Sequence, residues 1–125
     1  MHKYITLFFS VTFFLSACKA GKTPDEVINH NRMISLLTEL HIIDGLLYTA
    51  PQNPDSLYKY GADKYLALFK QYHTDSVQFK KSLKYYARQP VELAAIYDQV
   101  RNNLKQKMDS LNKLQQKQYN AIPNK

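Results

Sequence analysis

The residues best suited to chemistry are Glu39, His41 and Asp44, which lie close together in the chain. On a helix, His41 and Asp44 are i,i+3 neighbours, so they can pair or form half of a metal site. A structural zinc site needs four ligands and a catalytic one needs three. His30, eleven residues before His41, lies about 16 Å away along a helix. We therefore expect a local polar pair without a cofactor or metal, and the alternatives are partner binding and metal or acid–base chemistry.

Other catalytic patterns in the sequence are weak. Ser110 and Lys113 have the Ser-x-x-Lys spacing of acyl-serine enzymes, but they lie in a polar tail without companion motifs. Gly21 begins no phosphate-binding loop, because the upstream glycine is missing. Glu92 and Asp98 are expected on the exposed side of a helix, with no carboxylate opposite them. The sequence therefore predicts a protein that is not an enzyme.

The only cysteine, Cys18, ends an N-terminal export signal. Lys3 supplies the basic start, residues 5–15 are apolar except for three hydroxyl residues, and Ser16 and Ala17 are small. This apolar run is shorter than the roughly 20 residues that span a membrane, and its layout is typical of a cleaved secretory signal. Leu15-Ser-Ala-Cys18 resembles the lipobox of bacterial lipoproteins. The resemblance implies cleavage before Cys18 and lipid attachment to its thiol, although an ordinary signal with a chance cysteine is the alternative.

Lipidation would place the protein in the bacterial cell envelope. Two or three acyl chains hold a protein stably on a bilayer, whereas a single chain is marginal. Lys19 stands where inner-membrane retention would require aspartate, by analogy with lipoprotein sorting. We therefore expect a lipid-anchored protein of the outer membrane that faces the periplasm. Its tether, residues 19–23, spans at most about 18 Å.

Charge and aromatic composition suggest two kinds of binding. Seventeen basic and ten acidic residues give +7, or +6 once the signal with Lys3 is removed. Export argues against nucleic acid as the partner and favours anionic lipid, lipopolysaccharide or glycan. Tyrosines could provide a platform for sugars or peptides, although they could equally belong to the core. Two sets could form such a platform, either Tyr58, Tyr65 and Tyr72 or the pair Tyr85 and Tyr86.

Apolar periodicity predicts four helices joined by short turns, at about residues 23–48, 55–72, 75–87 and 90–120. Thr23 and Glu26 form a capping box around Pro24, which predicts that the first helix starts there. Asn53 or Asp55 is expected to cap the second helix, and Thr74 or Asp75 the third. Gly45 and Gly61 are expected to weaken their helices.

The last helix is predicted to be long, and its apolar stripe outlasts the expected core. That stripe continues through Leu104, Met108, Leu111 and Leu114 into a tail rich in Lys, Gln and Asn. Either the helix projects past the domain or its end frays. In the continuing stripe, Met108 and Leu111 are candidates for docking on a partner helix or on lipid.

These elements predict an all-α protein, a small four-helix bundle-like domain with a long C-terminal helix, after a cleaved lipoprotein signal peptide. The predicted divisions are the signal peptide at 1–17, a lipidated tether at 18–23, the helical domain at 24–105 and a polar extension at 106–125.

The run Thr74–Tyr86 and the residues that follow it resemble a family of small lipoproteins of Gram-negative bacteria. This family is grouped as domain-of-unknown-function family 4296. The resemblance covers about residues 24–105 and follows the lipobox; it rests further on Pro90, Leu93, Ile96, Tyr97, Val100, Met33, Leu40, His41 and Asp44. It implies a helical fold and a lipoprotein address, but no activity and no functional residue.

The function expected from the sequence is that of a membrane-anchored envelope lipoprotein that binds a protein partner through its aromatic and C-terminal apolar surfaces. The alternative is a glycan-, lipid- or lipopolysaccharide-binding module that uses tyrosines and basic residues. Binding to a phosphate-bearing ligand would weaken steeply with ionic strength, whereas binding through an apolar helix face would not.

Overall fold

The computed structural model describes residues 22–50 and 53–121, which form four helices and no strand. These are α2 (His30–Thr49), α3 (Pro54–Gln71), α4 (Ser76–Ala87) and α5 (Pro90–Asn120). The all-α prediction and the long last helix are confirmed. No helix in this part of the chain combines the length and apolar character needed to cross a bilayer.

Helix starts follow the capping chemistry of the sequence in three of four cases. The side chains of Asn29, Asn53 and Asp75 each accept a hydrogen bond from a backbone N–H of the first turn. This satisfies one of the donors that a helix start leaves without a partner. The fourth helix, α5, has no side-chain cap and begins with Pro90 instead. Asn53 and Asp75 were among the predicted caps.

The predicted start of the first helix at Thr23 is wrong, because α2 begins only at His30. Residues 24–27 form a turn, in which the Val27 N–H donates to the Pro24 carbonyl at 2.9 Å. Ile28 is 2% exposed, and both of its backbone polar groups bind α4: its N–H donates to Ser82 Oγ at 2.9 Å, and its carbonyl accepts from the Tyr86 hydroxyl at 2.8 Å. Tertiary packing therefore overrides a favourable local capping sequence. We call residues 22–29 the strap.

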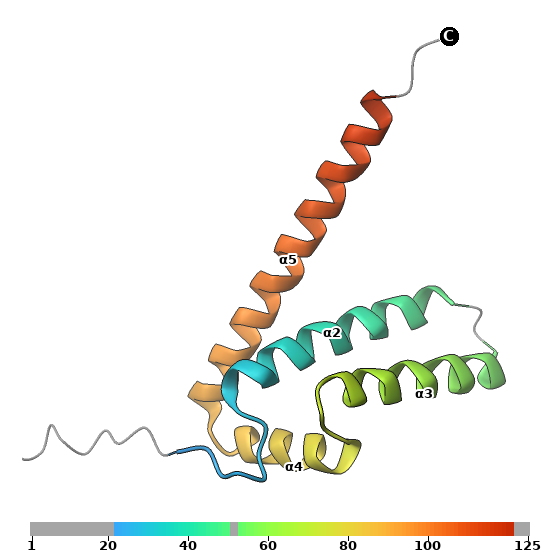
Figure 1. Ribbon diagram of the computed structural model, residues 1–125. Helices are drawn as coiled ribbons and strands as arrows, with labels where there is room; N and C mark the ends of the chain where they lie inside the picture. Colours follow the sequence, from blue (N-terminus) through green and yellow to red (C-terminus); the bar gives the residue numbers. More distant parts are fainter. Residues whose placement is uncertain (1–21, 51–52, 122–125) are drawn as a thin grey trace, which may run out of the picture.

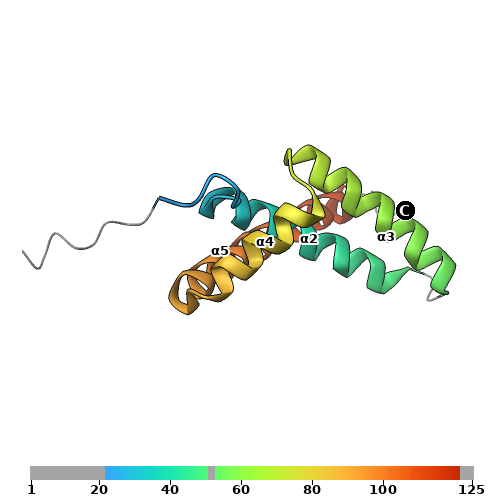
Figure 2. The ribbon, with the colours of Figure 1, turned by 90° about the horizontal axis from the view of Figure 1, so that it is seen from below.

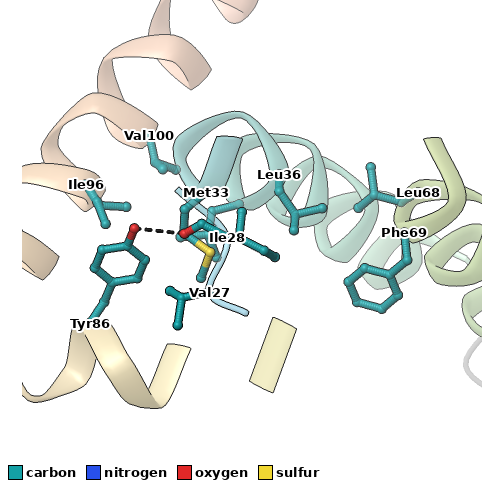
Figure 3. Packing of buried hydrophobic residues seen from close by; sticks show 10 residues of the cluster. Val27, Ile28, Met33, Leu36, Leu68, Phe69, Tyr86, Ile96 and Val100 are labelled. Carbon is teal, nitrogen blue, oxygen red and sulfur yellow. Dashed lines mark hydrogen bonds between the residues drawn. The ribbon is translucent and has the colours of Figure 1, made fainter. Parts of the chain in front are cut away.

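The core has α2 at its centre, with α3 on one side and α5 on the other (Figure 1). Met33, Ile96 and Val100 pack with the strap and Tyr86, while Leu36 reaches toward Leu68 and Phe69 of α3 (Figure 3). The view from below shows α4 lying beneath α2 (Figure 2), and α4 packs against α5. The strap, which α4 holds, closes this lower end of the core.

Gly61 is a packing position as well as a helix-weakening residue. It is buried in α3, and a Cβ atom placed there would lie 3.3 Å from Leu47 Cδ1 of α2. By contrast, a Cβ atom at Gly45 would meet nothing within 4 Å. The absence of a side chain at Gly61 therefore allows α2 and α3 to approach closely, whereas Gly45 has no such role.

Candidate binding surface

The apolar face of α5 is half covered. Ile96 and Val100 are 0% and 2% exposed where α5 crosses α2, and Leu104 is partly buried. At 3.6 residues per turn, Met108 and Leu111 continue this face. They are 56% and 61% exposed, and the next apolar residue, Leu114, is 57% exposed. We call Met108, Leu111 and Leu114 the free face of α5.

Figure 1 shows why the free face has no cover: α5 continues upward while α2 and α3 turn away from it. Residues 105–121 are all exposed, yet they remain helical to Asn120. The predicted alternatives were projection or fraying, and the structure shows projection. An apolar stripe on a preformed, exposed helix is a typical surface for docking another chain.

A groove of about 690 Å³ adjoins the free face. Its walls come from α2 and α5, and Tyr72 at the end of α3 also lines it; the remaining lining residues are Ser35, Thr38, Glu39, Asn103, Gln106, Lys107, Ser110 and Leu111. Leu111 therefore belongs both to the groove and to the free face. Two polar contacts join the walls: Glu39 pairs with Lys107 at 2.6 Å, and Asn103 Nδ2 donates to Thr38 Oγ1 at 3.4 Å.

Tyr72 is held in the groove from two directions. It is the residue that ends α3, and its backbone carbonyl accepts a hydrogen bond from the Arg32 guanidinium of α2. Burial raises the pKa of its hydroxyl, the nearby Glu39 carboxylate raises it further, and Lys107 opposes this. The phenol is therefore neutral at physiological pH and offers the groove a hydrogen-bond donor.

The sequence-predicted polar pair forms a separate cluster. His41 Nδ1 lies 3.4 Å from Asp44 Oδ2, and the Tyr65 hydroxyl of α3 donates to the other oxygen of Asp44. Burial, followed by this hydrogen bond and the negative charge of Asp44, raises the pKa of Tyr65 to about 12. The His41 ring also lies 6.1 Å from the ring of Tyr97 on α5. These four residues form what we call the polar cluster.

The polar cluster links neighbouring helices through a hydrogen bond and a ring contact. Asp44 is shared by His41 and Tyr65, which joins α2 to α3, and the described residues contain no group of three His, Cys, Asp or Glu side chains that could hold a metal. The polar cluster can bind a ligand by hydrogen bonding and by ring stacking on Tyr97 and His41, which are partly exposed.

The two sets of tyrosines that were candidates for a platform differ in their surroundings. Tyr58 is 81% exposed near the start of α3. Tyr65 belongs to the polar cluster, and Tyr72 belongs to the groove. Tyr86 is 1% exposed and its hydroxyl binds the strap, so its ring belongs to the core and not to the surface. Tyr85 is half buried, with its ring edge-on to that of Tyr86 at 5.2 Å.

Two features escaped the sequence reasoning. Glu92 was expected on the exposed side of its helix, but it is partly buried and contacts His30 Nδ1 at 2.5 Å across 62 positions. The polar walls of the groove were also missed, because Ser35, Thr38 and Asn103 resemble any solvent-facing helix residues. Only the crossing of α2 and α5 brings them together, and no local pattern predicts that crossing. Cys18, the predicted lipidation site, lies outside the described residues.

The family model "Domain of unknown function (DUF4296)" matches residues 24–110, which is most of the chain. The chain belongs to the DUF4296 family. No curated protein and no solved structure matches it significantly. The DUF4296 match includes residues 24–29 of the strap, the core and the polar cluster, and it ends within the second half of α5.

Proposed function

We propose that this DUF4296 protein is a non-enzymatic, lipid-anchored protein of the bacterial cell envelope, on the periplasmic face of the outer membrane, that binds a protein partner through α5. The observation that carries the binding proposal is the free face: three large apolar side chains, each more than half exposed, on a helix that extends past its own core. Exposed apolar groups that are contiguous and rimmed by polar residues commonly mark interaction sites.

The lipid-anchor part of the proposal rests on the sequence. Leu15–Cys18 has the lipobox pattern, and only three residues separate Cys18 from Lys22, the first described residue. That interval spans at most about 14 Å. The strap that follows is bound to α4 at the lower end of the molecule, where α5 also begins (Figure 1). An anchor at Cys18 would therefore hold this end near the bilayer.

The length of α5 then separates the anchor from the free face. Leu111 lies 21 residues beyond Pro90, which corresponds to about 32 Å along a helix with a rise of 1.5 Å per residue. If α5 stands away from the bilayer, the free face is presented in the periplasm at this height. A short tether and a long helix thus favour capture of a partner beyond the membrane surface.

Two substitutions test the two parts of the proposal separately. Cys18→Ala should abolish palmitate labelling and leave the unprocessed precursor, and normal labelling of this variant would refute the anchor.

For binding, a photoreactive residue at Leu111 should crosslink one envelope protein in intact cells. The same residue at Lys113, about 200° away around α5, is the matched control. Equal capture from both positions would refute a specific role for the free face.

The second candidate is a glycan-binding module, and the polar cluster is the observation that favours it. The cluster combines the rings of Tyr97 and His41 with a carboxylate that accepts hydrogen bonds, which suits a sugar. Its residues are already engaged with one another, and Tyr58 and Tyr72 lie elsewhere, so the support is weaker. Binding at this cluster would be lost in Tyr97→Ala and retained in Leu111→Asp, the reverse of the first proposal.

A further inference from the structure

The groove and the free face share Leu111, so they form one continuous surface with two different characters. The groove side is polar, with Ser35, Thr38 and Asn103 on its walls, and the free-face side is apolar. A ligand that covers both must supply hydrogen-bonding groups along one edge and apolar groups along the next. This is the pattern of an amphipathic helix laid into a groove.

Charge further limits the occupant. Residues 105–120 of α5 carry four lysines and one aspartate; the lysines are Lys105, Lys107, Lys113 and Lys117. Lys107 is neutralised by Glu39, whereas the described structure shows no ion pair for the other three. A basic helix surface attracts an acidic partner and repels a basic one.

From these observations we infer that the continuous surface is the docking site for an acidic amphipathic helix of a partner protein. This inference rests on the proposed function and names the class of partner. The spacing of Leu104, Met108 and Leu111, at four and three residues, is the spacing with which packed helices interdigitate. The partner helix lies along the second half of α5, with its apolar side on Met108, Leu111 and Leu114.

Two other occupants fit the surface less well. A bilayer can cover the free face, but in the adjoining groove hydrocarbon would remove water from Gln106 and from the Glu39–Lys107 ion pair, which is unfavourable. A second copy of the chain would place the same excess of lysines against its own. Both remain distinguishable outcomes of the experiment below.

The experiment uses the full-length protein in intact cells, with a photoreactive residue either at Ser35 on the α2 wall or at Leu111 on α5. Crosslinked peptides are identified by mass spectrometry. We expect both positions to capture the same segment of one envelope protein, with net negative charge and apolar residues three and four apart. Lys113, on the far side of α5, should not capture it.

Substitutions then test the two sides of the surface, with the crosslinker kept at Ser35. Leu111→Asp should reduce the yield at least about tenfold, since truncating a central anchor has effects of this size. Gln116→Asp introduces the same single charge at an exposed position about 140° away around α5, and it should change the yield much less. Reversal of Lys105 and Lys117 to Glu should lower capture severalfold, and added salt should weaken capture by the unchanged protein.

The inference is overturned if the captured segment is neutral or basic, or if it lacks helical apolar spacing; the proposed protein-binding function would survive that result. Crosslinks to this chain itself would replace the partner helix with a second copy. Crosslinks to lipid or glycan only, or capture of nothing from either position, would overturn both the inference and the proposed function.

Discussion

Removing the Tyr86 hydroxyl should destabilise the domain, because this hydroxyl binds the strap to α4. Tyr86→Phe leaves the Ile28 carbonyl without its donor in a position where both residues are almost fully buried. A buried polar group left unpaired costs about 1–3 kcal/mol. With a urea m value of about 2 kcal/mol per molar, a loss of about 2 kcal/mol lowers the unfolding midpoint by about 1 M.

The matched control is Tyr85→Phe, on the same helix and in ring contact with Tyr86. Its hydroxyl makes no hydrogen bond within the described residues, so we expect a change in the free energy of unfolding below about 0.5 kcal/mol. Both variants should be compared by urea unfolding followed by circular dichroism. If Tyr86→Phe costs no more than the control, the strap does not depend on this bond and the reasoning fails.

A double-mutant cycle shows whether the strap is held as a unit. Ser82→Ala removes the oxygen that accepts the Ile28 N–H, and this oxygen also donates to the Gln78 carbonyl within α4. If either substitution already releases the strap, the second has less to lose, and the double variant is destabilised less than the sum of the two. Interacting pairs of this kind couple by about 0.5–3 kcal/mol. Additive losses would mean that the two bonds act independently.

Three further predictions concern the glycines, the tail and the polar cluster. Gly45→Ala should raise the free energy of unfolding, measured by chemical denaturation, by about 0.5–1 kcal/mol. Gly61→Ala should raise it less or lower it, because the added Cβ approaches Leu47. Equal increases for the two variants would contradict this prediction. Deleting residues 106–125 should leave a cooperative melt at a similar temperature and remove about a fifth of the helical signal, and an unfolded product would show that the tail belongs to the core. In the folded state the pKa of Tyr65 is about 12, above the usual 10 of the unfolded chain. The protonated hydroxyl therefore contributes to the free energy of unfolding in full below pH 10, and this contribution is lost between pH 10 and 12. Asp44→Asn should lower the Tyr65 pKa, as measured by NMR of the ring carbons, and an unchanged value would exclude Asp44 as a cause.

The sequence predicted those features that depend on neighbours along the chain. Helical periodicity located α3, α4 and α5 closely, and the caps Asn53 and Asp75 were among the predicted residues. The pairing of His41 with Asp44 was also predictable, since three positions on a helix bring side chains together. These interactions need no knowledge of how helices cross.

Features that depend on helix crossing were not predictable. The start of α2 was wrong because the local capping signal at Thr23 competes with Ser82 and Tyr86, which lie more than fifty positions away. The contact of Tyr65 with Asp44 required the approach of α3 to α2, and the polar groove required α5 to cross α2. Patterns within a single sequence do not indicate which residues far apart in the chain come into contact.

The helical state of residues 106–120 follows from their continuity with the buried half of α5. An isolated helix of this length is marginal in water because its first turn is costly to form. Here the turns around Ile96 and Val100 are already fixed by the core, so each later residue only extends an existing helix. Asp109 also lies four residues from both Lys105 and Lys113, a spacing that favours opposite charges.

This continuity bears directly on the proposed binding role. A disordered tail that folds on its partner loses conformational entropy at that step, which weakens the complex. The second half of α5 is already helical, so a partner helix meets Met108, Leu111 and Leu114 in their final spacing. If the tail were disordered in the free protein, a helix-stabilising substitution such as Asn112→Ala would tighten binding. With a preformed helix, that substitution on its exposed, polar side should leave the affinity nearly unchanged.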